Sequence, residues 1–138
     1  MAEKLPLREG AFIETPEGGA LVANRCKACG QVFFPKARVC FSCFNEDMEE
    51  VRLSRRGNLY SYTIGRMPSL HFEPPYALGY IDMPEKVRIF APLEVEHGQY
   101  EKLKIGMEME VVVEKLWEEE GKEVIGWKFK PVIRGGKL

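Results

Sequence analysis

Alternating hydrophobic and polar positions dominate the chain from about residue 57 onward. In GNLYSYTIGR (57–66), the larger residues Leu59, Tyr60, Tyr62 and Ile64 are set among small ones, and aromatic and β-branched residues favour strands. Four more segments show strand-like patterns, at 76–83, 86–95, 107–117 and 122–132, and one segment, 98–106, suits a short helix. The pattern therefore predicts five strands with a small helix between the third and the fourth.

Five strands in this order are what a partly open Greek-key barrel, the OB-fold, requires. Small Src-homology-like barrels also have five strands, so strand number alone does not decide between the two folds. The helix placed between strands three and four favours the OB-fold. We expect this barrel to occupy residues 55–134.

The N-terminal part of the chain follows a different pattern. Residues 1–19 show little periodicity and contain several prolines and glycines, so we expect an arm that is loop or short helix and is ordered by a partner. Short strand-like segments then surround a cysteine-rich stretch within 20–54. We expect three parts: an arm at 1–19, a small metal-binding ribbon at 20–54, and the barrel.

All four cysteines fall within CKACGQVFFPKARVCFSC (26–43), as the pairs Cys26–Cys29 and Cys40–Cys43. Each C-x-x-C forms a tight turn that directs two sulfurs to one point, and two such turns supply four thiolates at about 2.3 Å from a zinc ion. Four protein ligands leave no open coordination position. The spacing therefore predicts a structural zinc and not a catalytic one.

Other uses of four cysteines remain as alternatives. A thioredoxin-like redox pair lies at the start of a helix in a βαβ unit and does not need a second C-x-x-C. Two disulfides need an oxidising compartment, and the N-terminal residues have no apolar run long enough for a signal peptide or a membrane span. Iron, alone or in a cluster, also accepts four thiolates. We expect a cytoplasmic protein with zinc.

The net charge and the positions of the histidines exclude further classes of function. Twenty basic and 21 acidic residues give a net charge of -1, which does not suit an avid polyanion binder. His71 and His97 lie in different segments without a partner nucleophile or carboxylate, and no phosphate-binding glycine loop is present. We expect no catalytic residues in this chain.

Two groups of basic residues are candidate ligands for the phosphates of a nucleotide tail. Lys36 and Arg38 lie between the cysteine pairs, and Arg55 and Arg56 lie where the ribbon meets the barrel. Charge-assisted hydrogen bonds from arginine and lysine commonly hold phosphates. The alternative is that each of them is a solvated charge or the partner of one of the many glutamates.

The order of four segments resembles a known family. These segments are the cysteine stretch, GNLYSYTIG, PPYALGYIDMPEKVRIFAPLE and KIGMEMEVVV. They are similar to small acyl-CoA-associated proteins, long catalogued as a domain of unknown function, with an N-terminal rubredoxin-like zinc ribbon and a C-terminal OB-fold. The resemblance covers about 20–132. The family often has proline, arginine and proline where this chain has Lys36, Ala37 and Phe41.

The resemblance implies a function. It implies a non-catalytic accessory subunit of a thiolase-like enzyme, which supports assembly of a hetero-oligomer and binding of acyl-CoA at the shared interface. A partner that is an acyl-CoA aldolase or hydratase is the alternative within the family. If the chain has this function, we expect the basic residues Lys36, Arg38, Arg55 and Arg56 to meet the phosphates of coenzyme A.

A rival function is binding of single-stranded nucleic acid, which zinc ribbons and OB-folds both support in other proteins. Tyr60, Tyr62 and Tyr80 are among the aromatic residues that could stack on bases. However, the basic footprint is confined to the junction and the C-terminal half is rich in glutamate. We therefore expect a protein partner, and neither a nucleic acid nor a membrane.

Overall fold

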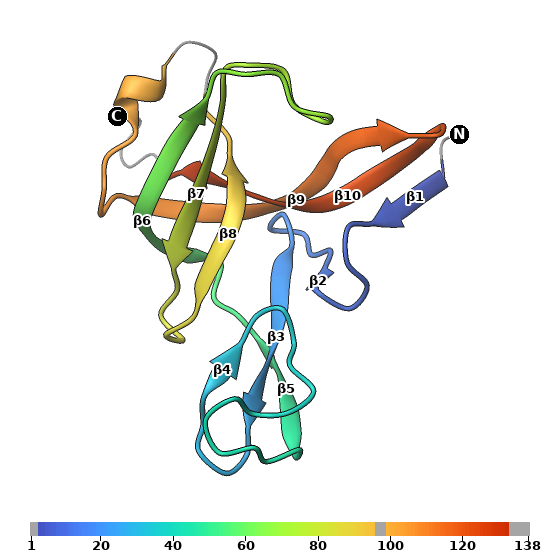
Figure 1. The fold of residues 1–138 in the computed structure, drawn as a ribbon, viewed down its shortest axis with the longest axis vertical. Coiled ribbons are helices and arrows are strands. Elements are labelled where there is room, and N and C mark those ends of the chain that lie inside the picture. Colours follow the sequence, from blue (N-terminus) through green and yellow to red (C-terminus); the bar gives the residue numbers. More distant parts are fainter. Residues whose placement is uncertain (1–2, 96–98, 133–138) are drawn as a thin grey trace.

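The computed structural model of this 138-residue chain describes residues 3–95 and 99–132. Strands account for almost all of the regular structure in these residues (Figure 1). The strands are β1 (Glu3–Pro6), β2 (Phe12–Ile13), β3 (Ala20–Cys26), β4 (Val32–Phe33), β5 (Met48–Arg52), β6 (Arg56–Gly65), β7 (Tyr76–Asp82), β8 (Arg88–Leu93), β9 (Glu108–Glu119) and β10 (Lys122–Pro131). A single 3₁₀ turn, η1 (Tyr100–Lys102), precedes β9.

Strands β6 to β10 close into a barrel. The sheet order is β10-β8-β7-β6-β9, and β9 pairs again with β10, so that the sheet returns to its start. The closing contact between β8 and β10 is parallel, at Phe129 and Leu93. Antiparallel strands with one parallel closure in this order form the five-stranded OB-fold. The predicted fold class, mainly β with a ribbon followed by an OB barrel, is confirmed.

The barrel interior follows from the alternation in the sequence. Leu59 on β6, Ile81 on β7 and Ile89 on β8 are buried, while their neighbours along each strand face outward. Met109, Val111 and Phe129 complete the interior from β9 and β10. The five predicted strands agree with the observed ones to within a few residues.

The ribbon lies below the barrel in Figure 1 and is built on β3. Strand β3 pairs with β2, β4 and β5. Leu21 and Ala23 of β3, together with Leu53 of the following linker, belong to the same buried cluster as the barrel residues. Ribbon and barrel therefore share one hydrophobic core, which fixes the metal-binding end relative to the barrel.

Two local expectations are wrong. The helix expected at 98–106 is one 3₁₀ turn, because Gln99 gives no side-chain cap and Leu103 is already extended; residue 98 lies outside the described residues. The N-terminal arm, expected as loop or helix, forms β1 and β2. Strand β1 runs parallel to the part of β10 that extends beyond the barrel, where an open strand edge is available for pairing.

None of the helical segments in the described residues is long and apolar enough to cross a membrane.

Candidate metal centre and basic junction

The two cysteine pairs adopt the same local turn. The N–H of Gly30 donates to the carbonyl of Cys26 at 2.8 Å, and the N–H of Phe44 donates to the carbonyl of Cys40 at 2.9 Å. The residue closing each turn is left-handed, with φ 82° at Gly30 and 62° at Phe44. Gly30 is recognisable from the sequence because glycine adopts this conformation without strain. Phe44 gives no such signal.

These turns bring all four sulfurs together. The Sγ atoms of Cys26 and Cys43 lie 3.5 Å apart, as do those of Cys29 and Cys40, and all four lie within 4.8 Å of one another. A regular tetrahedron with bonds of about 2.3 Å requires sulfur–sulfur distances of about 3.8 Å. The four thiols therefore fit a zinc ion, in agreement with the expected structural zinc.

The surroundings lower the pKa of two of the four thiols, Cys26 and Cys40, and so favour the thiolate form that binds metal, whereas neighbouring cysteine side chains help to raise the pKa of Cys29 and Cys43. The backbone N–H of Cys29 and the side-chain amide of Asn45 donate to the sulfur of Cys26, at 3.4 and 3.6 Å. The hydrogen bond from the Cys29 N–H contributes most to lowering the pKa of Cys26 to about 6. The N–H of Ser42 donates to the sulfur of Cys40 at 3.4 Å. A bound zinc would neutralise much of the charge that four thiolates bring.

The four basic candidate residues lie in two separate places. On the ribbon, Lys36 pairs with Glu50 at 2.5 Å, and Arg38 is exposed with no ion pair to any residue that the structure describes. At the junction, Arg55 and Arg56 both approach one carboxylate oxygen of Glu110, at 2.7 and 3.5 Å. The structure thus brings the two arginines of the junction together.

Arg55 is bound inside the chain. Its guanidinium donates to the carbonyls of Gly19 and Val111, each at 2.8 Å, besides its bond to Glu110. Only 22% of the side chain is exposed, against 51% for Arg56. Arg55 connects the N-terminal arm, the linker and β9, whereas Arg56 and Arg38 present more of their charge to solvent.

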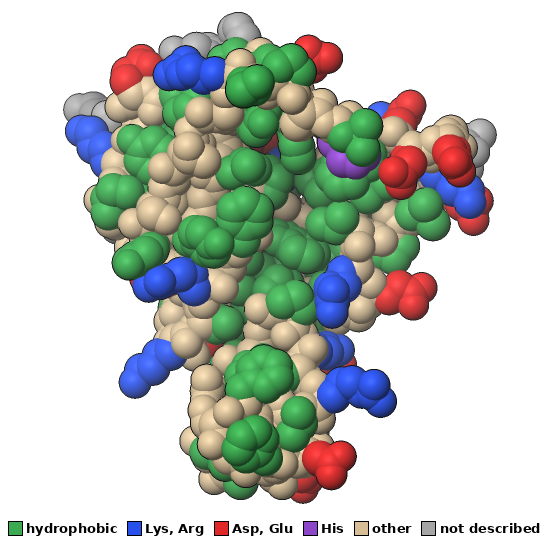
Figure 2. Space-filling model, in the orientation of Figure 1, with side chains coloured by type: hydrophobic (Ala, Val, Ile, Leu, Met, Phe, Trp, Pro, Cys, Tyr) green, Lys and Arg blue, Asp and Glu red, His purple; other side chains and the backbone are tan. Residues whose placement is uncertain are grey.

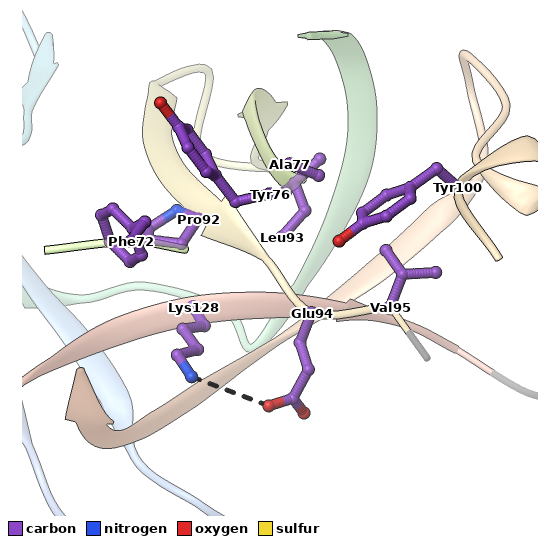
Figure 3. Close-up of a pocket in the computed structure, with 9 residues that line it drawn as sticks. All are labelled: Phe72, Tyr76, Ala77, Pro92, Leu93, Glu94, Val95, Tyr100 and Lys128. Atoms are coloured by element: carbon purple, nitrogen blue, oxygen red, sulfur yellow. Dashed lines mark ion pairs between the residues drawn. The ribbon is translucent and has the colours of Figure 1, made fainter. Parts of the chain in front are cut away.

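A small hollow of about 120 Å³ lies beside the loop 66–75 (Figure 3). Its walls include Phe72, Tyr76 and Tyr100, and Lys128 points across it toward Glu94, with 3.8 Å between Nζ and Oε1. The sequence pattern did not indicate this hollow, because its residues come from the loop 66–75, from β7, from the end of β8, from η1 and from β10. Aromatic walls with one ion pair suit a largely apolar group that carries a polar end.

Glu94 has an unusual environment in this hollow. Burial raises the pKa of Glu94, and hydrogen bonding with Glu114 raises it further. Lys128 opposes this shift but lies closer to Glu114, at 3.2 Å, than to Glu94.

Of the two histidines, His97 lies outside the described residues. His71 stacks on Trp117, with ring centroids 4.0 Å apart and planes at 9°. This contact and that of Phe72 with the same Trp117 ring join the loop 66–75 to β9. The position of His71 is therefore set by its packing against Trp117, which indicates a structural role.

Two family models match the chain. Residues 19–49 match the rubredoxin-like zinc ribbon domain of ChsH2, and residues 50–114 match the C-terminal OB-fold domain of ChsH2. The first match covers the four clustered cysteines, and the second covers four of the five barrel strands wholly or in part.

This chain is also similar to several curated proteins and solved structures. The benzoylsuccinyl-CoA thiolase subunit BbsA of Thauera aromatica is 40% identical over 125 residues, which cover 88% of this chain and 85% of that protein. A DUF35 domain-containing scaffold protein of Methanocaldococcus jannaschii is 32% identical, covering 96% of this chain and 94% of its own. The structure of an Ltp2-ChsH2(DUF35) aldolase matches with a TM-score of 0.65 and 28% identity, covering 83% of this chain and 86% of that one.

Proposed function

The chain belongs to the ChsH2 family of proteins that join a rubredoxin-like zinc ribbon to an OB-fold domain, and on this premise we propose that it is the accessory subunit of a thiolase-like acyl-CoA enzyme. The observation that carries the proposal is the 40% identity to a thiolase subunit along 85% of that subunit's length. The similarity thus spans ribbon and barrel together and is not confined to the cysteine motif.

The geometry of the thiols supports a role without chemistry of its own. A thiolase needs a reactive cysteine, and the four cysteines of this chain converge on one point that suits a closed metal site. In the proposed function, Cys26, Cys29, Cys40 and Cys43 hold a zinc that shapes the ribbon, and the partner supplies the nucleophile. The chain works in the cytoplasm, where reducing conditions keep these thiols available to the metal.

Coenzyme A is proposed to lie at the interface between the two subunits. The exposed guanidinium of Arg38 and the half-exposed one of Arg56 are best placed to meet phosphates, because each retains hydrogen-bond donors that face solvent. The ammonium group of Lys36 already pairs with Glu50, so a phosphate would have to share it with that carboxylate. Arg55 would not bind a phosphate itself, because its guanidinium donors already bond to groups of the chain. It would support the coenzyme A site only by holding the junction in place.

Copurification tests the proposal. The tagged chain is recovered from its native host, and the proteins that accompany it are identified by mass spectrometry. We expect a thiolase-like subunit in a constant ratio to the chain. Recovery of the chain without any acyl-CoA enzyme would overturn the proposal.

The same experiment decides between partner classes. Similar proteins include an aldolase complex and a probable enoyl-CoA hydratase alpha subunit of Thermomonospora curvata, of which the chain covers 31%. An aldolase or hydratase in place of the thiolase would keep the accessory role and change the reaction.

A further inference from the structure

The outer surface of the barrel carries a group of exposed aromatic residues. Tyr60, Tyr80 and Phe90 are exposed by 50%, 43% and 52%. Tyr80 and Phe90 are directly opposite each other on β7 and β8, with ring centroids 5.1 Å apart. Leu78 and Pro92 form the next outward pair on the same two strands. We call Tyr60, Leu78, Tyr80, Phe90 and Pro92 the aromatic face.

The aromatic face forms a continuous surface. Figure 2 shows hydrophobic side chains gathered over the part of the molecule where β7 and β8 lie in Figure 1. Along β7, the outward positions continue from Leu78 to Tyr76, whose ring contacts Phe72 in the loop 66–75. That loop adds Met67 and Leu70, exposed by 77% and 89%. Large contiguous apolar surfaces of this kind mark interaction sites.

The charges at the face exclude some partners. Arg88 lies over the ring of Tyr60, with Cζ 3.4 Å from the ring centroid, and its guanidinium bonds to Asp82 at 2.6 Å. The positive charge of Arg88 is therefore matched by a neighbour. A nucleic acid strand or an anionic membrane would need unmatched basic residues beside the aromatic rings. A neutral aromatic centre with an ion pair at its edge is instead the anatomy of a protein–protein interface.

The size of the face fits the same kind of partner. Fully buried aromatic side chains cover roughly 150–250 Å² each, so the exposed parts of Tyr60, Tyr80 and Phe90 supply about 300 Å². Each side of a standard protein interface buries about 800 Å². The three rings would supply more than a third of that area, and Met67 and Leu70 would extend it. This is enough to form the desolvated centre of a stable heteromeric contact.

We propose that the aromatic face is the surface on which the thiolase-like subunit docks, with Tyr80 and Phe90 at its centre. This inference rests on the proposed function for the identity of the partner. Arg56 and Tyr60 are both exposed positions of β6, so coenzyme A bound at Arg56 would lie beside the docked subunit, as the proposed function requires.

The test uses the full chain and the thiolase-like subunit that copurifies with it. Phe90→Glu places a charge at the centre of the face, and Ile105→Glu is the matched control because Ile105 is equally apolar, exposed by 63% and outside the face. We expect Phe90→Glu to lower recovery of the partner at least about tenfold, as loss of an interface hot spot does. Ile105→Glu should leave recovery unchanged, and both variants should keep the wild-type melting temperature and zinc content.

The outcomes separate this inference from the proposed function. If the wild-type chain recovers no acyl-CoA enzyme, the proposed function fails. If the wild-type chain recovers the partner and Phe90→Glu recovers it equally well, the docking surface is wrong while the function stands. A dimer of the chain alone that Phe90→Glu dissociates, or binding of a single-stranded DNA oligonucleotide that Tyr80→Ala abolishes, would also overturn the inference.

Discussion

Arg55 and Glu110 form an ion pair of 2.7 Å at the point where the linker from the ribbon enters the barrel. Both side chains are about four-fifths buried, at 22% and 21% exposure. The same guanidinium holds the carbonyls of Gly19 and Val111. A single side chain thus satisfies groups from the N-terminal arm and from β9, and it links the metal-binding end of the molecule to the barrel.

Replacement of Arg55 should therefore destabilise the fold. Arg55→Met leaves two carbonyls without their donor and Glu110 with only its weaker contact to Arg56, at a cost of about 2–4 kcal/mol in the free energy of unfolding. Arg56→Met is the control, since an exposed pair contributes at most about 1 kcal/mol. Urea unfolding measures both. Equal, small losses for the two variants would show that the buried network does not hold the junction.

Coenzyme A affinity should depend on Arg38 and not on distant surface charges. In the assembled complex, Arg38→Glu should weaken affinity for the thioester by about 1–3 kcal/mol, the range for a lost charged hydrogen bond. Lys122→Glu makes the same charge change at the far end of the β9–β10 hairpin and should have no effect. The Michaelis constant is the readout. An unchanged value for Arg38→Glu in a normally assembled complex removes Arg38 from the site.

Loss of one cysteine should remove the metal and unfold the ribbon. Cys40 is fully buried, and in Cys40→Ser the weaker oxygen donor replaces one of four thiolates in a module whose folding depends on metal. Metal analysis should find one zinc per chain in the wild type and much less in the variant. Ser42→Ala, which leaves all four thiols in place, should keep its zinc. Full zinc content in Cys40→Ser would contradict the four-thiolate site.

The left-handed position in the second cysteine turn predicts a stabilising substitution. Phe44 adopts φ 62° with its ring 75% exposed, so its conformation is costly and little packing compensates. Asparagine tolerates this conformation better, and Phe44→Asn should stabilise the ribbon by about 0.5–1 kcal/mol. Gly30→Ala, at the equivalent position, should destabilise it by about 1 kcal/mol. Thermal unfolding of the zinc-bound chain measures both, and a lower melting temperature for Phe44→Asn would refute the strain argument.

The stability of the barrel should respond to the protonation of Glu94. Because burial and Glu114 raise the folded-state pKa of Glu94, the folded chain binds this proton more tightly than the unfolded chain, whose value is near 4.5. The resulting stabilisation is complete below the unfolded pKa and is lost as pH rises through the folded pKa. The variant Glu94→Gln does not lose stability in this way, because the glutamine amide does not titrate. The melting temperature of the variant, relative to that of the wild type, should therefore increase as pH rises above the unfolded pKa of about 4.5. A difference that stays constant or shrinks as pH rises would contradict the assignment.

The sequence predicted those features that depend on local pattern. Alternation located the barrel strands because β7 and β8 bury every second side chain and β6 and β9 do so over their first parts, and the C-x-x-C spacing located the four thiols. Features set by distant contacts were missed. Strand β1 exists because β10 offers an open edge, and Arg55 is structural because Gly19 and Val111 meet at the junction. Residues adjacent in sequence, such as Arg55 and Arg56, can differ more than twofold in the exposed fraction of the side chain.

Reconstitution tests the accessory role most directly. The thiolase-like subunit is purified alone and with the zinc-bound chain, and thiolytic cleavage of its acyl-CoA substrate is measured in both preparations and with the chain by itself. The chain alone should show no turnover, and the partner should reach its full activity only after the chain is added. Turnover by the isolated chain, or equal activity and equal Michaelis constants for the partner with and without the chain, would contradict the proposed function.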